Sequence, residues 1–473
     1  MRPANCLPGL VPILLWLACL LAPAGETSPI RDQAPGITAA GDPRQTLDPG
    51  RYFTAAEMAQ WRHYRLTRVK MGLIAVGSVL FFYTLFLLLG LNRRLRLFSE
   101  RGAERCYASP FLARLGSRCP SLRSVVRVPE RLFGGRQWLV VLLYCLLFFF
   151  LLELCLFPYF FYRSFWYEVR QGLSNYTLGL WLADWLKGLC LTTVLDAAMV
   201  FGIYGLLARV GSRWWLLLWA GVSVAILAWV VILPYRSLLF SRFQPLEAGE
   251  VRTRLETLVH AQGLELEDIL VVDASRRTKA VNAYVQGTGP TRRMVLYDNL
   301  LRQFSPREIV MVFAHELAHW KNPPGKMQVL VFSLTVFLVL WLANRVLERG
   351  SRVAWLHYGT PRDVASLPVL LLTFYLVFLL IKPVNLYWKR THERETDRQA
   401  LEMVCDPDAY VQVQVKLARL NREYVDPPPW IVAFFHSHPP FRERLSLALT
   451  QPCSPPPPDG SPAGKPAGPS LRP

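Results

Sequence analysis

Long apolar stretches constrain the fold of this chain more than any other feature of its sequence. An α-helix of roughly 20 residues crosses the hydrocarbon core of a membrane, which is about 30 Å thick. Stretches of about that length follow residue 70 at 71–91, 138–162, 188–207, 214–234, 327–343 and 367–384. The last two are short, so the sequence predicts four to six transmembrane helices. A mainly α, polytopic membrane protein is expected, and a purely soluble fold is excluded because 52% of the residues are hydrophobic.

The first 24 residues have the order of a secretory signal. Arg2 precedes an apolar run from Leu7 to Leu21, and small residues around Ala24 supply a cleavage site. We expect residues 1–24 to be a signal peptide or an uncleaved signal anchor, followed by an exported flexible segment at 25–70. At the other end, residues 451–473 are rich in proline, serine and glycine and are expected to be disordered.

Basic residues are concentrated between the first two apolar stretches. The whole chain has a net charge of +19, and the loop at 93–136 holds eleven arginines against three glutamates. This excess is typical of a cytoplasmic loop that sets membrane orientation. No nucleic-acid-binding motif accompanies the charge, so no nucleic-acid partner is expected.

Alternation of the six apolar stretches then fixes the side of the other segments. The connections that contain Arg209 and Arg213, and Arg345 to Arg362, fall on the same side as the basic loop. Segments 235–326 and 385–450 fall on the opposite side. We therefore expect a multi-pass protein, of a bacterial inner membrane, whose segments 235–326 and 385–450 lie on the exported side.

The segment 235–326 has the pattern of a small mixed domain. A helix is predicted at 247–262, and Gly263 ends it. Short strands are predicted at 269–272, 280–285 and 294–297, with a glycine-containing turn joining the last two. Ser305, Pro306 and Glu308 form a helix start with a capping box before the helix at 309–320.

That last helix carries His315, Glu316 and His319 in an HExxH pattern. A spacing of four residues puts both imidazoles on one helix face, where they can hold one zinc ion. Glu316 can then act as general base toward the attacking water. The alternative is a pair of solvated histidines on a helix surface. The nine cysteines show no CxxC pair, so they do not indicate a cysteine-ligated metal.

A catalytic zinc site needs a third protein ligand, for which Glu393 is the best candidate. Asp397 lies four residues later on the same helical face and could orient a ligating histidine. His392 and Glu395 are rival ligands, although neither shares that face. The competing interpretation of this segment is an exposed, charged helix.

Several separated motifs run in order from about Arg136 to Leu447. They are Gly172-Leu173-Ser174-Asn175 with Thr177-Leu178-Gly179, Val281-Asn282-Ala283-Tyr284, the HExxH helix through Trp320, Arg390-Thr391-His392-Glu393 with Asp397, and Ser437-His438-Pro439-Pro440 with Glu443-Arg444-Leu445. Together these motifs resemble the CAAX prenyl protease type 1 family of membrane-embedded zinc metalloproteases.

This resemblance implies a gluzincin-like peptidase core with a small β-sheet, closing over a helical bundle or barrel with a large chamber. One zinc ion per chain would bind His315, His319 and Glu393, with Glu316 as base. The resemblance also implies that His438 stabilises the oxyanion and Arg444 supports the substrate. It places Asn282 on the edge strand that pairs with the peptide. By position alone, His438 would be a capping residue before two prolines.

The chain also departs from the family pattern. Ala318 replaces a glycine in the zinc helix, residues 322–325 end that helix early, and an arginine-rich stretch at 100–135 replaces an apolar segment. These departures leave the hydrolytic centre intact. They concern the prenyl-protein substrate, the closure of the chamber and the orientation in the membrane.

The expected function is that of a zinc metalloendopeptidase embedded in the membrane. Its substrates would be membrane-associated or prenylated, CAAX-type proteins or peptides, and membrane lipids would surround it. One alternative is a quality-control protease for misfolded or lipidated membrane proteins, which would share every catalytic residue. Another is a non-catalytic membrane scaffold that retains a zinc site, although structural zinc has no use for Glu316. A site-2-type intramembrane protease is disfavoured because no Leu-Asp-Gly motif is present.

Overall fold

A computed structural model describes residues 47–108, 133, 135–232, 243–279, 281–286, 292–322 and 326–451. The predicted signal at 1–24, the segment up to residue 46, most of the basic loop and the tail from residue 452 lie outside this part of the chain. The fold divides into two compact units. Of the described residues, 65–108, 133, 135–232 and 326–387 form what we call the helical unit, and 47–64, 243–279, 281–286, 292–322 and 388–451 form the mixed unit.

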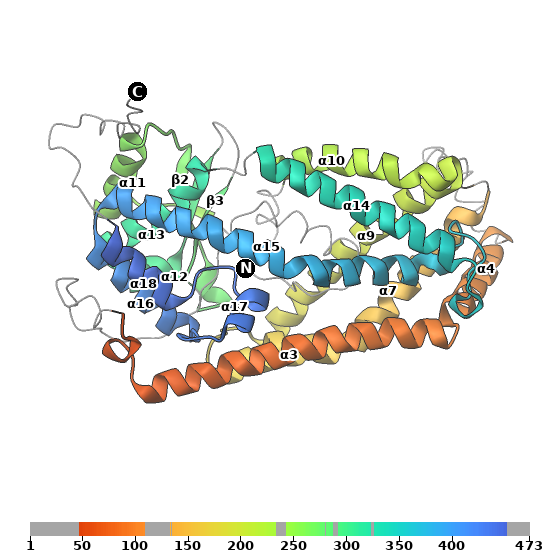
Figure 1. The fold of residues 1–473 in the computed structure, drawn as a ribbon, viewed down its shortest axis with the longest axis horizontal. Coiled ribbons are helices and arrows are strands. Elements are labelled where there is room, and N and C mark those ends of the chain that lie inside the picture. The colour runs from red at the N-terminus through yellow and green to blue at the C-terminus, as the bar shows by residue number, and fades with distance from the viewer. Residues whose placement is uncertain are drawn as a thin grey trace, which may run out of the picture. The chain divides into compact units, whose positions relative to one another are not determined.

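Long helices build the helical unit (Figure 1). They are α3 (Ala55–Leu88), α4 (Leu91–Ala108), α7 (Gln137–Phe161), α9 (Leu178–Val210), α10 (Trp214–Ile232), α14 (Lys326–Gly350) and α15 (Leu367–Val404). Shorter helical pieces are Tyr162–Trp166, α8 (Tyr167–Arg170), Gly211–Arg213, Ala354–Leu356 and Val364–Ser366. The first ten residues of α3, and α15 from Trp388 onward, belong to the mixed unit.

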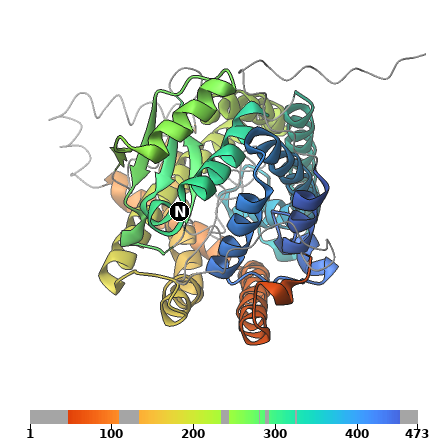
Figure 2. The same ribbon diagram turned by 90° about the vertical axis from the view of Figure 1, so that its left-hand side faces the viewer.

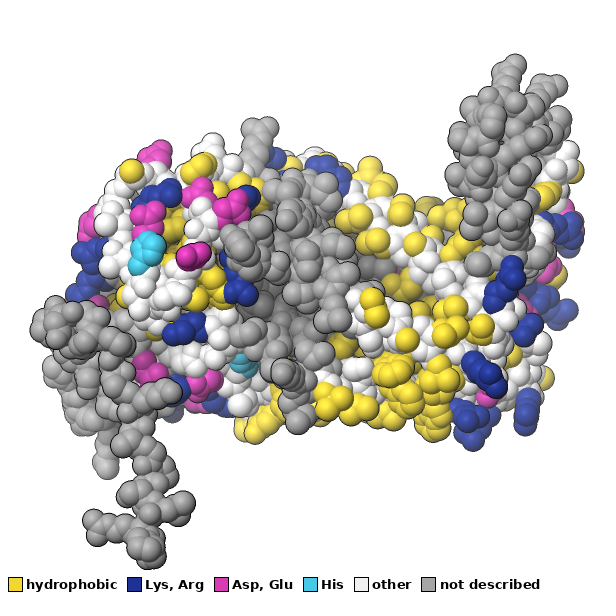
Figure 3. Space-filling model, turned by 90° about the horizontal axis from the view of Figure 1, so that it is seen from above, with side chains coloured by type: hydrophobic (Ala, Val, Ile, Leu, Met, Phe, Trp, Pro, Cys, Tyr) yellow, Lys and Arg dark blue, Asp and Glu magenta, His cyan; other side chains and the backbone are white. Residues whose placement is uncertain are grey.

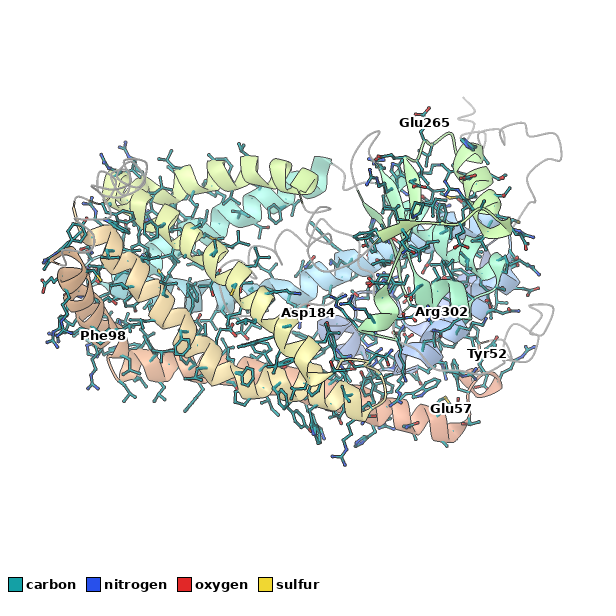
Figure 4. The ribbon with its side chains drawn as sticks, turned by 180° about the vertical axis from the view of Figure 1, so that it is seen from behind. Tyr52, Glu57, Phe98, Asp184, Glu265 and Arg302 are labelled. Carbon is teal, nitrogen blue, oxygen red and sulfur yellow. The ribbon has the colours of Figure 1, made fainter. Side chains whose placement is uncertain are left out.

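Five segments of the described chain are long and apolar enough to cross a membrane: Ala55–Leu88, Gln137–Arg170, Leu178–Val224, Leu330–Gly350 and Val364–Val404. The third of these contains two helices, because the chain turns at Gly211, where φ is +60°. Figure 4 shows the chain reversing there, with α10 turning back at an angle to α9. The mainly α, polytopic fold is therefore confirmed, and these segments hold six apolar helices where the sequence predicted four to six.

Apolar side chains on the helical unit point both inward and outward. Tyr144, Phe148 and Trp214 are buried in its core, whereas Phe81 and Leu380 are 66% and 76% exposed. Figure 3 shows a broad apolar surface on this unit. Lipid is the solvent that makes such exposure favourable.

Three connections of the helical unit meet at one end, on the right in Figure 1. The amide Nδ2 of Asn92 on α4 donates to the carbonyls of Leu356 and Ala365, at 2.8 and 3.0 Å. Arg96 forms an ion pair with Asp363. Trp214 at the start of α10 donates to Asn344 near the end of α14, at 2.7 Å. Lys and Arg side chains gather at this end in Figure 3.

The segment expected to be flexible at 25–70 is helical in its last third. Thr54 and Glu57 form a capping box in which each backbone N–H donates to the other side chain, at 2.8 and 3.2 Å. Trp61 and Tyr64 are buried. The prediction of a flexible segment was therefore wrong for residues 55–70, because a cap and two buried aromatic side chains order the start of α3.

A four-stranded sheet lies in the mixed unit (Figure 2). Its order is β1 (Phe243–Pro245), β2 (Asp268–Val272), β4 (Arg293–Tyr297) and β3 (Ala283–Gln286). β2 pairs in parallel with β4, and the other two pairs are antiparallel. The three predicted strands are confirmed, and β3 is an edge strand. β1 was not predicted, because it is only three residues long and ends in proline.

Helices complete the mixed unit: α11 (Glu250–Ala261), α12 (Asp298–Gln303), α13 (Pro306–Lys321), α16 (Pro407–Asn421), α17 (Pro429–Phe435) and α18 (Phe441–Thr450), with a short turn of helix at Ala274–Arg276. Gly263, at φ +65°, follows α11 as predicted. Leu255, Leu296, Phe313, Leu401 and Leu445 belong to one buried core. This core fixes α13 against the sheet and against the end of α15.

Candidate metal centre

Local sequence fixes the helix that carries the two histidines. The predicted capping box of α13 is present: Glu308 N–H donates to Ser305 Oγ at 3.4 Å, and Ser305 N–H donates to Glu308 Oε2 at 2.6 Å. Lys416 Nζ also contacts Glu308 Oε2 at 2.7 Å. Phe313 and Ala318, on either side of His315, are fully buried. The capping box and Lys416 fix the start of α13, and buried neighbours fix its middle, so the helix holds the imidazoles of His315 and His319 in place.

The end of α15 brings the predicted third ligand to these histidines. Glu393 is only 3% exposed and Asp397 only 1%, so this segment is not an exposed charged helix. Glu393 Oε2 lies 3.3 Å from His315 Nε2, and Glu393 Oε1 lies 3.6 Å from His319 Nε2. One ligand atom from each of these three residues lies within 4.8 Å of the other two. This geometry brings two nitrogens and one carboxylate together around one point.

The polar atoms of this cluster fit a metal ion. His319 Nε2 and Glu393 Oε2 are buried and have no hydrogen-bond partner among the described residues. A buried polar atom without a partner is unfavourable, and coordination to a cation satisfies it. Two imidazoles and a carboxylate are the donor set of many catalytic zinc sites. His315, His319 and Glu393 are therefore suited to hold a divalent metal.

The pKa values of His315, His319 and Glu316 show that the cluster of buried groups favours one positive charge. Burial disfavours a charged His315, but the hydrogen bond to Asp397 and the negative charges of Asp397 and Glu393 outweigh it and raise the pKa of His315 to about 10. Burial, with the neighbouring His315, lowers the pKa of His319 to about 3. Burial also raises the pKa of Glu316 to about 8. A proton on His315 thus supplies the charge that a metal ion would supply instead.

Asp397 contacts the ring nitrogen of His315 that faces away from Glu393, and Arg444 contacts Asp397 in turn. Asp397 Oδ1 lies 3.0 Å from His315 Nδ1, as expected for a residue that orients a ligand. Arg444 donates to both oxygens of Asp397, from Nε at 2.8 Å and from Nη2 at 2.6 Å. The predicted substrate contact of Arg444 stays a prediction, and its donors here hold Asp397 in place.

His438 lies beside the cluster, in the connection between α17 and α18. Its Nε2 is 3.5 Å from Glu393 Oε2, and its Nδ1 is 3.0 Å from Ser437 Oγ. The residue that precedes α18 is Pro440, and no side chain caps that helix. Burial lowers the pKa of His438. The capping interpretation is thus wrong, because His438 faces Glu393 and does not cap α18.

The remaining predicted residues are placed as follows. Asn282 directly precedes the edge strand β3, and its carbonyl accepts from Tyr297 N–H at 2.9 Å. Its pairing with substrate stays a prediction. The rival ligand Glu395 accepts a hydrogen bond from Arg398 Nε at 3.0 Å, and the rival His392 packs its ring 5.4 Å from the ring of His319. Within the described chain, only His315, His319 and Glu393 converge closely enough to share one metal ion.

Sequence reasoning assigned no role to Arg390, which the structure connects to the His438 segment. Arg390 is buried, and its Nη1 donates to the carbonyls of Val432 and His436 at 2.9 and 2.8 Å. Val432 lies in the last turn of α17, and His436 is the residue that directly follows this helix, two residues before His438. Residue 390 shares a helical face with Glu393 and Asp397, so the periodicity that identified them could also have identified Arg390.

Known proteins match both parts of the chain. The sequence profile of peptidase family M48 matches residues 245–451, and that of the CAAX prenyl protease N-terminal region, described as five membrane helices, matches residues 48–238. The described part of the latter range contains four long apolar helices, α3, α7, α9 and α10. The arginine-rich α4 between the first two is not among the segments suited to cross a membrane.

Individual relatives agree with these profiles. The CAAX prenyl protease 1 homolog of Oryza sativa subsp. japonica is 30% identical over 294 residues, which cover 61% of this chain and 68% of the relative. CAAX prenyl protease 1 of Saccharomyces cerevisiae is 27% identical over 61% of this chain and 67% of its own length. The uncharacterized metalloprotease YhfN of Bacillus subtilis is also 27% identical, over 59% of this chain and 67% of its own length.

A solved structure supports the fold. The crystal structure of S. mikatae Ste24p superposes with a TM-score of 0.70 and covers 95% of this chain and 99% of the other, at 18% sequence identity. The HExxH helix, the buried histidine–glutamate cluster and the apolar helices α3, α7, α9, α10, α14 and α15 all lie within the two ranges matched by the profiles. The chain therefore belongs to the CAAX prenyl protease 1 family of M48 peptidases and is a multi-pass membrane metalloprotease.

Proposed function

We propose that this protein is a zinc endopeptidase that cleaves prenylated, CAAX-type proteins or peptides at the membrane. One zinc ion per chain is held by His315, His319 and Glu393. The observation that carries the proposal is the buried cluster itself, in which His319 Nε2 and Glu393 Oε2 have no partner among the described residues. Glu316 stands next to the first ligand and completes a set that a purely structural site does not need.

The chemistry that zinc supplies when bound is polarisation of the scissile carbonyl and acidification of a water molecule. Glu316 removes a proton from the attacking water and later passes it to the leaving amine. Burial raises the pKa of Glu316 to about 8, and a nearby cation lowers it again, so the group can both accept and release a proton near neutral pH. His438 donates to the oxyanion of the tetrahedral intermediate from its position beside Glu393.

The proposed substrate class rests on the relatives, several of which are named as CAAX prenyl proteases. A quality-control protease would use the same residues, but it would cleave substrates with and without a prenyl group equally well. A scaffold would bind zinc without cleaving peptide. Membrane lipids surround the helical unit in each case, and a nucleic acid has no proposed part.

We also propose that the catalytic residues lie on the exported side of a bacterial inner membrane. The arginine-rich connections of the helical unit meet at one end, which the positive-inside rule assigns to the cytoplasm. α14 runs toward that end and α15 leaves it (Figure 1), which supports a proposal in which α15 crosses the membrane back to the exported side before Glu393. The signal-like N-terminus gives the same orientation.

One assay tests the activity and the substrate class together. Purified protein is given the same peptide with and without a prenyl group, and the Glu316→Gln variant serves as control. We expect the prenylated peptide to be cleaved faster, and neither peptide to be cleaved by the variant. Equal rates for both peptides would indicate the quality-control alternative, and absence of cleavage despite bound zinc would indicate a scaffold.

A further inference from the structure

The second zinc histidine has a polar neighbour that the mechanism above does not use. Thr396 lies on α15, is fully buried, and places its Oγ1 3.2 Å from His319 Nδ1. The same Oγ1 lies 2.9 Å from the carbonyl oxygen of His392, one helical turn earlier. The hydroxyl therefore touches two groups at hydrogen-bonding distance.

Counting hydrogens decides which group accepts and which donates. A threonine hydroxyl has one hydrogen, whereas a carbonyl oxygen can only accept. Two oxygens 2.9 Å apart with no hydrogen between them would repel, so the hydroxyl hydrogen of Thr396 points at the His392 carbonyl. The oxygen of Thr396 is then left as an acceptor, and the hydrogen between it and His319 must come from Nδ1.

This arrangement fixes the tautomer of the imidazole. A histidine that binds a metal is neutral and carries one hydrogen on the nitrogen that does not face the metal. With that hydrogen on Nδ1, Nε2 has a free lone pair. Nε2 is the atom that lies 3.6 Å from Glu393 Oε1 and has no hydrogen-bond partner in the described chain.

We infer that Thr396 is a positioning residue that sets the tautomer and ring orientation of His319 for metal binding. It does for His319 what Asp397 does for His315, but through a neutral hydroxyl. α15 thus supplies a ligand, Glu393, and both orienting groups within about one turn. This inference rests on the proposed zinc site and extends it to a residue that neither the motifs nor the spacing had indicated.

The choice of a neutral group has a physical reason. Glu316, Glu393 and Asp397 already bring three buried carboxyl groups to this site, and Arg444 pairs with Asp397. A further carboxylate behind His319 would have to be buried without a matching cation, which is costly. A hydroxyl whose own hydrogen is held by the helix backbone provides an acceptor without adding charge.

The test uses the full-length protein and a small set of substitutions. Thr396→Val keeps the shape of the side chain and removes the acceptor, whereas Thr396→Ser keeps the hydroxyl. The matched control is Thr373→Val, because Thr373 is buried on the same helix and makes the same contact to a carbonyl four residues earlier, at 2.8 Å from Val369, outside the zinc cluster. Thr396→Ala serves as a second hydroxyl-free variant should the valine hinder folding.

The readouts are the zinc dissociation constant, measured by competition with a chelator, and the visible spectrum of the cobalt-substituted protein. We expect Thr396→Val and Thr396→Ala to weaken zinc binding by about 10- to 100-fold and to alter the cobalt spectrum, as loss of an orienting partner usually does. Thr396→Ser and Thr373→Val should stay close to the unsubstituted protein.

Thermal unfolding with and without zinc separates this role from a structural one. A residue that only packs would lower the melting temperature of the metal-free protein and leave the zinc-induced increase unchanged, which would overturn the inference. Equal losses of zinc affinity in Thr396→Val and Thr396→Ser would also overturn it. If the unsubstituted protein bound no zinc, the proposed function would fail as well, whereas normal binding with an unaffected Thr396→Val would refute only the tautomer role.

Discussion

At the scale of single residues, the site consists of ligands that other side chains hold in place. His315 is held by Asp397, His319 by Thr396, and Asp397 by Arg444. Glu316 differs, because it is buried next to a ligand and its protonation responds to the charge of the cluster. Substitutions should therefore separate metal binding from proton transfer.

Replacement of the base tests that separation. We expect Glu316→Gln to retain about one zinc per chain while peptide cleavage falls by a factor on the order of a thousand, because the amide cannot accept the proton of the attacking water. His315→Ala, His319→Ala and Glu393→Ala should instead lose zinc. Metal analysis of the purified variants alongside a cleavage assay provides the measurement, and zinc loss in Glu316→Gln would contradict the role of base.

His438 should act only as charge develops on the substrate. We expect His438→Ala to lower kcat by roughly a hundredfold with little change in KM or zinc content, because the missing donor matters only in the transition state. Steady-state kinetics with a prenylated peptide measures both constants. An effect mainly on KM would make His438 a substrate-binding residue.

Zinc affinity should rise with pH. His315 has a pKa of about 10 in the metal-free protein, so near neutral pH it holds a proton that zinc must displace. Displacing one proton makes the apparent affinity increase about tenfold per pH unit. Competition with a chelator at about one-unit steps from mildly acidic to mildly alkaline pH measures the slope. A flat response would show that His315 is already neutral.

The raised pKa of His315 also makes the stability of the metal-free protein depend on pH. The ordinary histidine pKa is about 6.5, and the folded value is higher, so the contribution of His315 to stability is fully present below about pH 6.5. That contribution is lost as pH rises through about 10. Zinc should therefore stabilise the protein most on the alkaline side of neutrality, and melting curves with and without zinc check this.

At the scale of elements, α15 organises the site. Glu393, Thr396 and Asp397 face α13, while Arg390 holds the last turn of α17. The sequence predicted the HExxH helix, its capping box and the ligand face of α15, because each follows from a local spacing. It did not predict Arg390 or Thr396, since their partners lie on segments 42 and 77 residues away in the chain. β1 was missed because it is only three residues long and ends in proline, and the start of α3 was missed because its order depends on the Thr54–Glu57 capping box together with the burial of Trp61 and Tyr64.

Arg390 should act through α17 on His438. Arg390→Ala removes the donor to two carbonyls at the end of α17, so the segment that carries His438 should loosen and kcat should fall by up to roughly a hundredfold. Zinc content should not change, because the substitution leaves the three ligands and their orienting groups in place. Hydrogen exchange over residues 429–440 measures the loosening.

A matched control lies four residues further along the same helix. Arg394 pairs with Glu443 on a half-exposed surface, so Arg394→Ala should leave both hydrogen exchange at 429–440 and kcat nearly unchanged. If Arg390→Ala behaved in the same way, α17 would be held by its own packing and not by this arginine.

At the scale of the whole molecule, the order of the apolar helices bears on the proposed orientation in the membrane. The apolar helices alternate in direction within the helical unit, and α4 with the two other basic connections shares one end. The basic residues at this end and the alternation of the apolar helices therefore both support the proposed orientation in the membrane. The sequence predicted the number of crossings only within a range, because the apolar stretches that lie in α14 and α15 are short.

Labelling of single cysteines tests the orientation directly. Ala261, at the exposed end of α11 in the mixed unit, is replaced by cysteine in a variant without native cysteines, and a second variant keeps only Cys106, which is exposed on α4. Intact cells are treated with a membrane-impermeant thiol reagent. We expect the cysteine at 261 to react at once, because its unit lies on the exported side, and Cys106 to react only after the membrane is opened. The opposite pattern would place the zinc site in the cytoplasm, and it would mean that the arginine-rich end of the helical unit is held on the exported side against the positive-inside rule.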